Sequence, residues 1–448
     1  MLEAIAKAWA IPELRKRVQY VFLMFTVFAI GAHIPVPGLD HDKILKIFGG
    51  QAGGLLGLVD VFSGGALRRM SLFAMGIGPY INASIIMQMM TFAIPSLEAM
   101  QKEGEAGRKR IAAITRKLTI VFATVQAFSM IALFRGGGVS LSILQTLQIV
   151  TVLTAGSILL LWLGEQVTQK GVGNGVSLVI FAGIMLSLPY QVNIIIQQLR
   201  EKNVYPIHVL LFLAIFIGTV YAVVHITQGS RRIPIAHAKR IIGMRQTQAS
   251  ASFLPIKVNS AGVIPIIFAI SLMLFPATIL NLLPVRSGEG PIGWLKDRAM
   301  LFNPGSLWSI GPLELPIPTL FYALLIVAFT YFYTSIVMNV GEMADNLKKY
   351  GNYIPGIRPG KPTHEYLDRV ISRITFAGAI FLAGVAILQY LVYWLIPGMS
   401  KFQTFQLIGG TSLLIVVGVA IETMQAIEAQ LLMRDYEGFI KSSPKSAQ

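Results

Sequence analysis

Long apolar stretches recur along this chain and are separated by shorter polar segments. A helix needs about 20 apolar residues to cross the hydrocarbon core of a bilayer. The pattern predicts ten such helices, and the fifth is the least regular because Pro189 and Gln191 interrupt its second half. The predicted spans are residues 18–34, 72–95, 118–134, 145–163, 176–197, 207–226, 259–284, 318–338, 374–396 and 406–424.

The second predicted span is interrupted, and a short apolar stretch precedes it. Residues 72–95 contain Gly76, Gly78 and Pro79, while residues 55–67 are too short and too rich in glycine to cross a bilayer. Irregular backbone at membrane depth is tolerated only where protein buries it or where it lines a cavity. We therefore expect both segments to lie inside the protein, at or near a central cavity.

The composition is that of an integral membrane protein. Hydrophobic residues make up 54% of the chain and charged residues only 13%, about half the fraction usual in soluble domains. The absence of cysteine excludes disulfides, cysteine-bound zinc and a thiol nucleophile. The basic segment Leu14–Arg17 leads into a full-length apolar run without a cleavage site, which indicates a first transmembrane helix rather than a signal peptide.

The basic residues predict the orientation. Of the 37 Lys and Arg residues, 26 lie in the N-terminus, the even-numbered loops and the C-terminal tail, which places both termini in the cytoplasm. The loop 228–257 has six cations and no acidic residue, a pattern that suits RNA or an acidic protein surface. In the loop 339–373, the turn Gly356–Gly360 is expected to hold Arg358 away from the membrane. The loop 96–117 fits an orienting anchor and a docking surface equally well.

The sequence contains one internal match. Gly76–Ile81 and Gly262–Ile267 both read Gly, β-branched, any, Pro, any, Ile, and they lie in the second span of each set of five. Matching interruptions of this kind indicate inverted repeats with a functional site at their interface. Because Gly and Pro are common in membrane helices, a chance match is the alternative.

Polar side chains gather on the same two spans. Asn82, Ser84 and Gln88 lie on one, and Asn259 and Ser260 on the other. Hydrogen bonds between such groups contribute about 0.6 kcal/mol each in a membrane, which suits a seam that opens. Permanent helix packing is the alternative that remains open.

Several function classes are disfavoured. The cores of the spans hold no Asp, Glu, Lys or Arg, and Glu422 lies only at the end of the tenth, which argues against ion-coupled transport. The sequence has no phosphate-binding loop and no spacing typical of a metal site or a Ser/His pair. These features favour a passive conduit, with no cofactor, that is closed by a constriction of aliphatic side chains.

Motifs along nearly the whole chain resemble those of the SecY family, the channel subunits of the bacterial protein-conducting translocon. They are Phe62–Leu67, Gly78–Ile85, Lys102–Lys109, Trp162–Gln166, Gly173–Gly175, Leu254–Asn259, Ala261–Pro265, Phe275–Thr278, Ala344–Lys349, Gly356–Gly360 and Gly409–Ile415. The resemblance implies an all-α polytopic membrane protein with ten transmembrane helices in two inverted, pseudo-symmetric five-helix halves, 1–197 and 198–448. It also implies a re-entrant plug helix at about 55–67 and a lateral gate between spans two and seven.

The resemblance implies roles for particular residues. The pore ring would comprise Ile77, Ile81, Val176, Ile180, Ile267 and Ile415, where Val176 replaces the family's isoleucine. The plug would include Leu55, Leu58, Asp60, Phe62 and Leu67. The gate would use Asn82, Ser84, Gln88, Asn259 and Ser260. Partners would dock on Arg232, Lys239, Arg240, Arg245 and Arg358. The segment Asn339–Glu342 departs from the family's Asn-Pro-Arg-Glu, so the contact of that arginine is not expected here.

The function implied is a protein-conducting channel in the bacterial cytoplasmic membrane. Unfolded secretory polypeptides would cross it, and transmembrane segments would leave sideways into lipid. The implied partners are SecE-like and SecG-like membrane subunits, the SecA motor ATPase, the translating ribosome through its RNA, signal sequences and the nascent polypeptide. The residues alone leave open an inverted-repeat transporter for a small uncharged solute, and they disfavour an intramembrane enzyme.

Overall fold

The computed structural model is mostly helical, and a helix lies at each of the ten predicted spans. Residues are described over 9–39, 53–136, 139, 141–201, 205–237, 241–242, 245–246, 252–282, 290, 308–310, 313–395 and 409–442. The ten helices are α2 (Pro12–Gly31), α5 (Gly78–Ala93), α7 (Glu105–Gly136), α8 (Ile143–Lys170), α9 (Gly175–Arg200), α10 (Pro206–Gln228), α11 (Ile264–Leu282), α13 (Ile317–Val337), α15 (Lys361–Leu395) and α17 (Thr411–Ser442).

Length and composition single out most of these helices as membrane spans. Within the described residues, seven helices are long and apolar enough to cross a bilayer. An eighth candidate is α5 together with α6 (Pro95–Lys102), which follows it after a bend of 98°. The remaining two are α2, which begins with several charged residues, and the shorter α11. The chain is therefore a multi-pass membrane protein.

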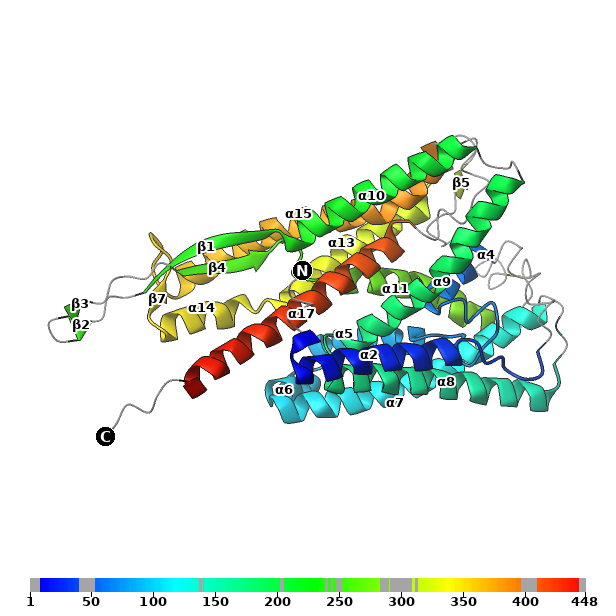
Figure 1. Cartoon of the computed structure of the whole chain (residues 1–448), viewed down its shortest axis with the longest axis horizontal. Helices are drawn as coiled ribbons and strands as arrows, with labels where there is room; N and C mark the ends of the chain where they lie inside the picture. The colour runs from blue at the N-terminus through cyan, green and yellow to red at the C-terminus, as the bar shows by residue number, and fades with distance from the viewer. Residues whose placement is uncertain are drawn as a thin grey trace.

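The helices form two groups that meet along the middle of the molecule. Figure 1 shows α2 and α5 to α8 on one side and α10, α13 and α15 on the other, with α9, α11 and α17 between them. The largest hydrophobic core draws buried side chains from both groups, such as Ile81 on α5 and Ile326 on α13, and from the helices between them, such as Ile415 on α17. The central core is therefore the contact between the two groups.

Two local predictions need correction. The second span does not begin as a helix at residue 72, because residues 71–77 form turns and α5 starts at Gly78 with a proline in its first turn. The fifth span is unbroken, because α9 continues through Pro189. Gln191 is buried in this helix and its amide donates to Ser187 Oγ at 3.3 Å.

Two of the basic loops fold together into one body that the sequence did not predict. Strands β1 (Ser230–His237), β4 (Ser252–Lys257) and β7 (Asn352–Tyr353) form an antiparallel sheet in the order β4-β1-β7. A small core joins this sheet to α14 (Val340–Lys349) and the start of α15, and its buried members are Ile233, Ile256, Ile354, Leu367 and Ile371. The two loops are therefore packed together as one body.

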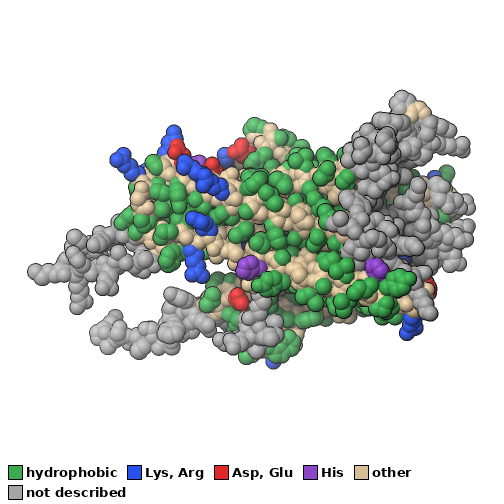
Figure 2. Space-filling view, turned by 90° about the horizontal axis from the view of Figure 1, so that it is seen from above, with side chains coloured by type: hydrophobic (Ala, Val, Ile, Leu, Met, Phe, Trp, Pro, Cys, Tyr) green, Lys and Arg blue, Asp and Glu red, His purple; other side chains and the backbone are tan. Residues whose placement is uncertain are grey.

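The remaining elements are one short helix and four short strands. They are α4 (Gly53–Phe62), β2 (Ile241–Ile242), β3 (Arg245–Gln246), β5 (Trp308–Ile310) and β6 (Leu313–Leu315). In Figure 2, Lys and Arg side chains gather mainly at the end that carries the three-stranded sheet, and the face between the ends is mostly hydrophobic. This distribution is typical of a protein whose middle lies in lipid.

Candidate functional site

Aliphatic side chains from four helices meet in the middle of the molecule. Ile77, Ile81, Ile180 and Ile415 are buried in one core, and Val176 and Ile267 pack against it while partly exposed. These are the six residues predicted for the pore ring, and the fold brings all of them together.

The repeated sequence motif builds the same local structure twice. In Gly76–Ile81 and Gly262–Ile267, the first glycine has a positive φ, 57° and 65° respectively, which favours glycine over other residues. In both, the helix begins at the third position, the proline is its second residue and the isoleucine its fourth. The isoleucine amide then bonds to the carbonyl four residues earlier, at 3.2 Å in the first motif and 3.4 Å in the second. The motif therefore starts a helix and places one ring residue in its first turn.

The ring lies between two cavities. One cavity has a volume of about 70 Å³ and the other about 170 Å³, and Ile81, Ile180 and Ile267 line both. The first cavity is also lined by Phe62 and Ser63 at the end of α4. The second is also lined by Ser84, Gln88, Asn174, Ser177 and Tyr333. Each of the six aliphatic residues thus lines at least one of the two cavities, and we call the place where the two cavities adjoin the waist.

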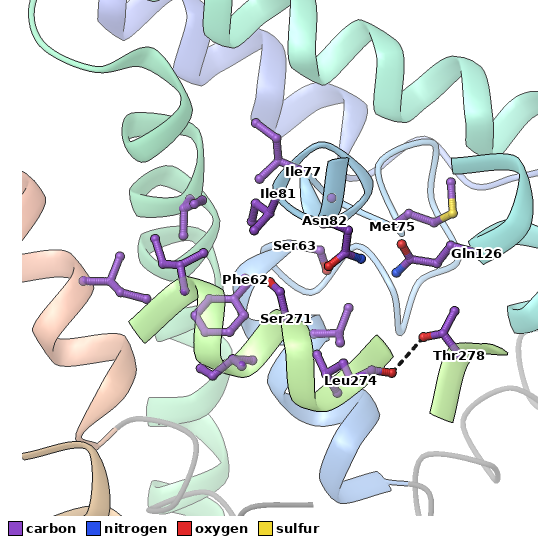
Figure 3. Close-up of a pocket in the computed structure, with 17 residues that line it drawn as sticks. Phe62, Ser63, Met75, Ile77, Ile81, Asn82, Gln126, Ser271, Leu274 and Thr278 are labelled. Carbon is purple, nitrogen blue, oxygen red and sulfur yellow. Dashed lines mark hydrogen bonds between the residues drawn. The ribbon is translucent and has the colours of Figure 1, made fainter. Parts of the chain in front are cut away.

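A polar seam borders the first cavity, between α7 and α11. Figure 3 shows Gln126 of α7, together with Ser271 and Thr278 of α11, around the cavity, with the bond from Thr278 Oγ1 to Leu274 O as a dashed line. Ser129, one turn from Gln126, donates from Oγ to the carbonyl of Thr278 at 2.7 Å. This bond crosses the seam from α7 of the first group to α11, which lies between the two groups.

Two aromatic pairs continue the same seam. The rings of Phe122 on α7 and Phe275 on α11 have centroids 5.8 Å apart. Phe92 at the end of α5 and Phe332 on α13 are 5.5 Å apart. The aromatic pairs and the Ser129 hydrogen bond across the seam between α5 and α7 on one side and α11 and α13 on the other are each individually weak contacts.

The predicted gate residues are only partly at this seam. Asn82 lines the first cavity, and Gln88 donates to Ser84 Oγ at 3.4 Å beside the second. Asn259 and Ser260 precede α11, and their hydrogen bonds stay within the turn, to Gly262 O at 3.1 Å and Lys257 O at 3.0 Å. Among the described residues, no hydrogen bond joins these two side chains to α5.

Gln126, Ser129, Ser271 and Thr278 are the seam residues that the sequence reading missed. Gln126 and Ser129 are spaced three residues apart in an otherwise apolar span, so they lie on one helix face. Ser271 and Thr278 are seven residues apart, which is the same relation over two turns. The spacing of these polar residues on one face of each helix was the signal in the sequence that could have indicated the seam.

The predicted plug forms a short helix seated on α9. Helix α4 ends at Phe62, whose carbonyl lies so close to Gly183 that a Cβ there would collide with it. Asp60 and Leu67 are buried, at 3% and 1% exposed. Leu55 and Leu58 belong to α4, but their side chains are outside the described residues. Seated in this way, the end of α4 contributes to the wall of the first cavity.

The basic residues predicted for docking fall into two groups. Arg232 on β1 and Arg358 are exposed, and Arg358 lies between Gly356 and Gly360, both with positive φ. Thr363 Oγ1 donates to the carbonyl of Arg358 at 2.8 Å, which fixes the turn. Arg245 belongs to β3 with its side chain outside the described residues, and Lys239 and Arg240 lie outside them altogether.

Comparisons with known proteins agree on one family. The model of the SecY family matches residues 71–424. The protein translocase subunit SecY of Halalkalibacterium halodurans is 44% identical, over 98% of this chain and all of that protein. A solved structure concerned with the plug domain of a SecY protein and its membrane seal has a TM-score of 0.64 at 21% identity, with 95% of this chain and 96% of that chain covered. The canine Sec61 of a ribosome-channel complex has a TM-score of 0.57 at 19% identity, with 95% and 96% covered.

Proposed function

Because this chain belongs to the SecY family and is a protein-conducting channel, we propose that unfolded polypeptides pass through the six-residue aliphatic ring. The observation that carries this assignment is the position of the ring between two cavities. Aliphatic side chains exclude water and ions from a narrow passage and still deform around a polypeptide. In this role α4 is the plug that covers one face of the ring at rest.

The channel opens, in this proposal, between two halves. We assign residues 1–197 and 198–448 to the halves, with the lateral gate along the seam of α5 and α7 against α11 and α13. A signal sequence or transmembrane segment enters lipid there when the free energy of its transfer into the membrane is favourable. Each charged residue at the centre of the segment opposes this transfer by about 2.5 to 3.5 kcal/mol. The chain itself performs no chemistry, so a partner supplies the energy.

The bond from Ser129 to the carbonyl of Thr278 is expected to hold the gate weakly. Ser129→Ala removes this bond, and with it about 0.6 kcal/mol of the free energy that keeps the gate closed. A substrate with a weakened signal sequence should therefore be translocated about threefold more. In vitro translocation measures this. Thr124→Ala is the matched control, since its hydroxyl bonds within α7 to Ile120 O. An equal gain in both variants would contradict the role of Ser129.

Partners dock on the sheet of β4, β1 and β7, through Arg232 and Arg358. We propose a SecA-type motor and the translating ribosome as alternating partners there, because exposed cations suit acidic protein and RNA surfaces. SecE-like and SecG-like subunits complete the complex in the lipid, where α10 presents exposed apolar side chains such as Leu210 and Ile217. The sheet and both termini then face the cytoplasm of a bacterial cell. A protease map that places Arg110 and Arg358 outside would contradict this orientation.

Crosslinking tests the proposed function directly. A photoreactive residue at position 81 or 267 should form adducts with a secreted protein during its synthesis, because both side chains line the waist. The same probe at Ile149, buried in a separate core, is the control and should give none. Absence of nascent-chain adducts at both ring positions would favour the rival, an inverted-repeat carrier for a small uncharged solute.

A further inference from the structure

A buried ion pair joins the end of α4 to the chain that follows it. Arg68 Nη2 lies 2.6 Å from Asp60 Oδ2, and Arg68 Nε lies 3.2 Å from the same oxygen. The backbone N–H of Arg68 donates to Asp60 Oδ1 at 2.9 Å. The Asp60 side chain is 4% exposed and that of Arg68 20%. Both carboxylate oxygens are therefore engaged by one residue, in a site largely closed to water.

Arg68 belongs to a part of the chain that is held in place. Its guanidinium carbon lies 3.6 Å from the centre of the Tyr190 ring on α9, a favourable cation–π contact. The residues after it are joined to the segment that follows α2 by two backbone hydrogen bonds: Val36 N–H donates to Met70 O at 2.8 Å, and Leu72 N–H to Ile34 O at 2.9 Å. Asp60, by contrast, lies on α4 itself. The ion pair thus links α4 to a fixed support.

The location of Asp60 makes its partner necessary. It lies in the last turn of α4, where the negative end of the helix dipole disfavours a carboxylate. Removal of one partner from a buried ion pair leaves the other charge uncompensated, which is strongly destabilising. Pairing with Arg68 therefore stabilises the end of α4 at this place.

The ion pair is also close to the cavity that lies next to the ring. Phe62 and Ser63, two and three residues after Asp60, line the cavity next to the ring. Ser63 Oγ donates to the carbonyl of Asp60 at 3.1 Å. A polypeptide that enters this cavity displaces Phe62 and Ser63 and so pulls directly on Asp60.

We propose that Asp60 and Arg68 are the pair that positions the plug, and that the plug leaves the ring by breaking it while Arg68 stays on Tyr190. This inference rests on the proposed function, in which α4 is the plug. The pair sets how firmly the resting channel is sealed. It is a positioning pair, because neither residue lines the waist itself.

The conductance of the resting channel in planar bilayers tests whether the ion pair holds the plug in place. Asp60→Asn and Arg68→Gln should each raise it at least about tenfold, because each leaves one buried partner unpaired. The double variant D60N/R68Q should leak less than the product of the two single effects, since no uncompensated charge remains. Arg69→Gln is the matched control, because the neighbouring Arg69 makes no ion pair with Asp60 among the described residues.

A thiol probe separates movement of the plug from loss of the fold. The chain has no cysteine, so F62C reports alone. Its reaction with a membrane-impermeant thiol reagent should be slow in the otherwise unchanged channel and faster after Asp60→Asn or Arg68→Gln. I131C, in a separate buried core, should stay unreactive in every variant that is folded.

Either of two results would contradict the proposal that this ion pair positions the plug. In the first, both single variants fold, and neither the conductance nor the reactivity of F62C changes. In the second, the effects of the two single variants on conductance simply multiply in the double variant. If these variants are silent while the ring variant Ile81→Gly/Ile267→Gly leaks, the pair is wrong and the channel assignment stands. If the ring variant is silent as well, the proposed function fails with it.

Discussion

Replacing Ile81 and Ile267 together by glycine is expected to make the resting channel conduct ions. These two residues lie at the same position of the two repeated motifs and line the cavities on both sides of the waist. Glycine removes both side chains from the narrowest part of the path, so water is no longer excluded by a continuous aliphatic surface. We expect an increase of at least about a hundredfold in resting conductance, because a closed aliphatic constriction is replaced by an opening that water and ions can enter.

Planar bilayers with the purified complex measure this effect, and two controls define it. Ile81→Leu/Ile267→Leu keeps aliphatic side chains at both positions and should remain closed. Ile326→Gly removes a fully buried isoleucine of the same core that lines neither cavity. It should lower the stability of the protein without raising its resting conductance. A folded double glycine variant with unchanged conductance would contradict the assignment of these two residues to the pore ring.

Most of the helical fold is readable from the sequence, for a physical reason. Lipid offers no hydrogen-bond partner to the backbone, so an apolar run of sufficient length must be a helix wherever it is exposed to lipid. The repeat can also be read from the sequence, because in both copies a glycine with positive φ precedes a helix that has a proline in its first turn, and both features favour those residue types. The pattern of Gly76–Ile81 predicts an interruption within a helix, whereas in the structure turns precede it and α5 begins at Gly78.

The other details depend on contacts between distant residues. Residues 230–257 and 352–353 read as basic loops, because nothing local specifies that β1 pairs with both β4 and β7. Asn259 and Ser260 are polar residues before a helix, and such residues also bond locally in turns, as they do here. The ion pair of Asp60 and Arg68 spans eight residues of irregular chain, a spacing that no periodic pattern indicates.

Arg358→Glu is expected to abolish translocation driven by a docked partner while the channel still inserts into the membrane. Arg358 is exposed in a turn fixed by Thr363, and Ile354, four residues before it, is buried in the core shared by the three-stranded sheet and α15. The arginine therefore protrudes from a rigid support, as an interface anchor requires. Loss of such an anchor costs about 2 kcal/mol or more, so translocation at a limiting motor concentration should fall at least about 30-fold.

Vesicles that contain the channel, a SecA-type motor and a labelled secretory protein measure this loss. Lys361→Glu is the matched control, because it makes the same change of charge three residues away, at an exposed position in the first turn of α15. It should reduce translocation only slightly, since a charge at the rim of an interface acts mainly on the association rate and is screened by salt. If the anchor is specific, high salt should rescue Lys361→Glu and leave Arg358→Glu inactive. Normal translocation by Arg358→Glu, or an equal loss in both variants, would show that the turn is not the docking anchor.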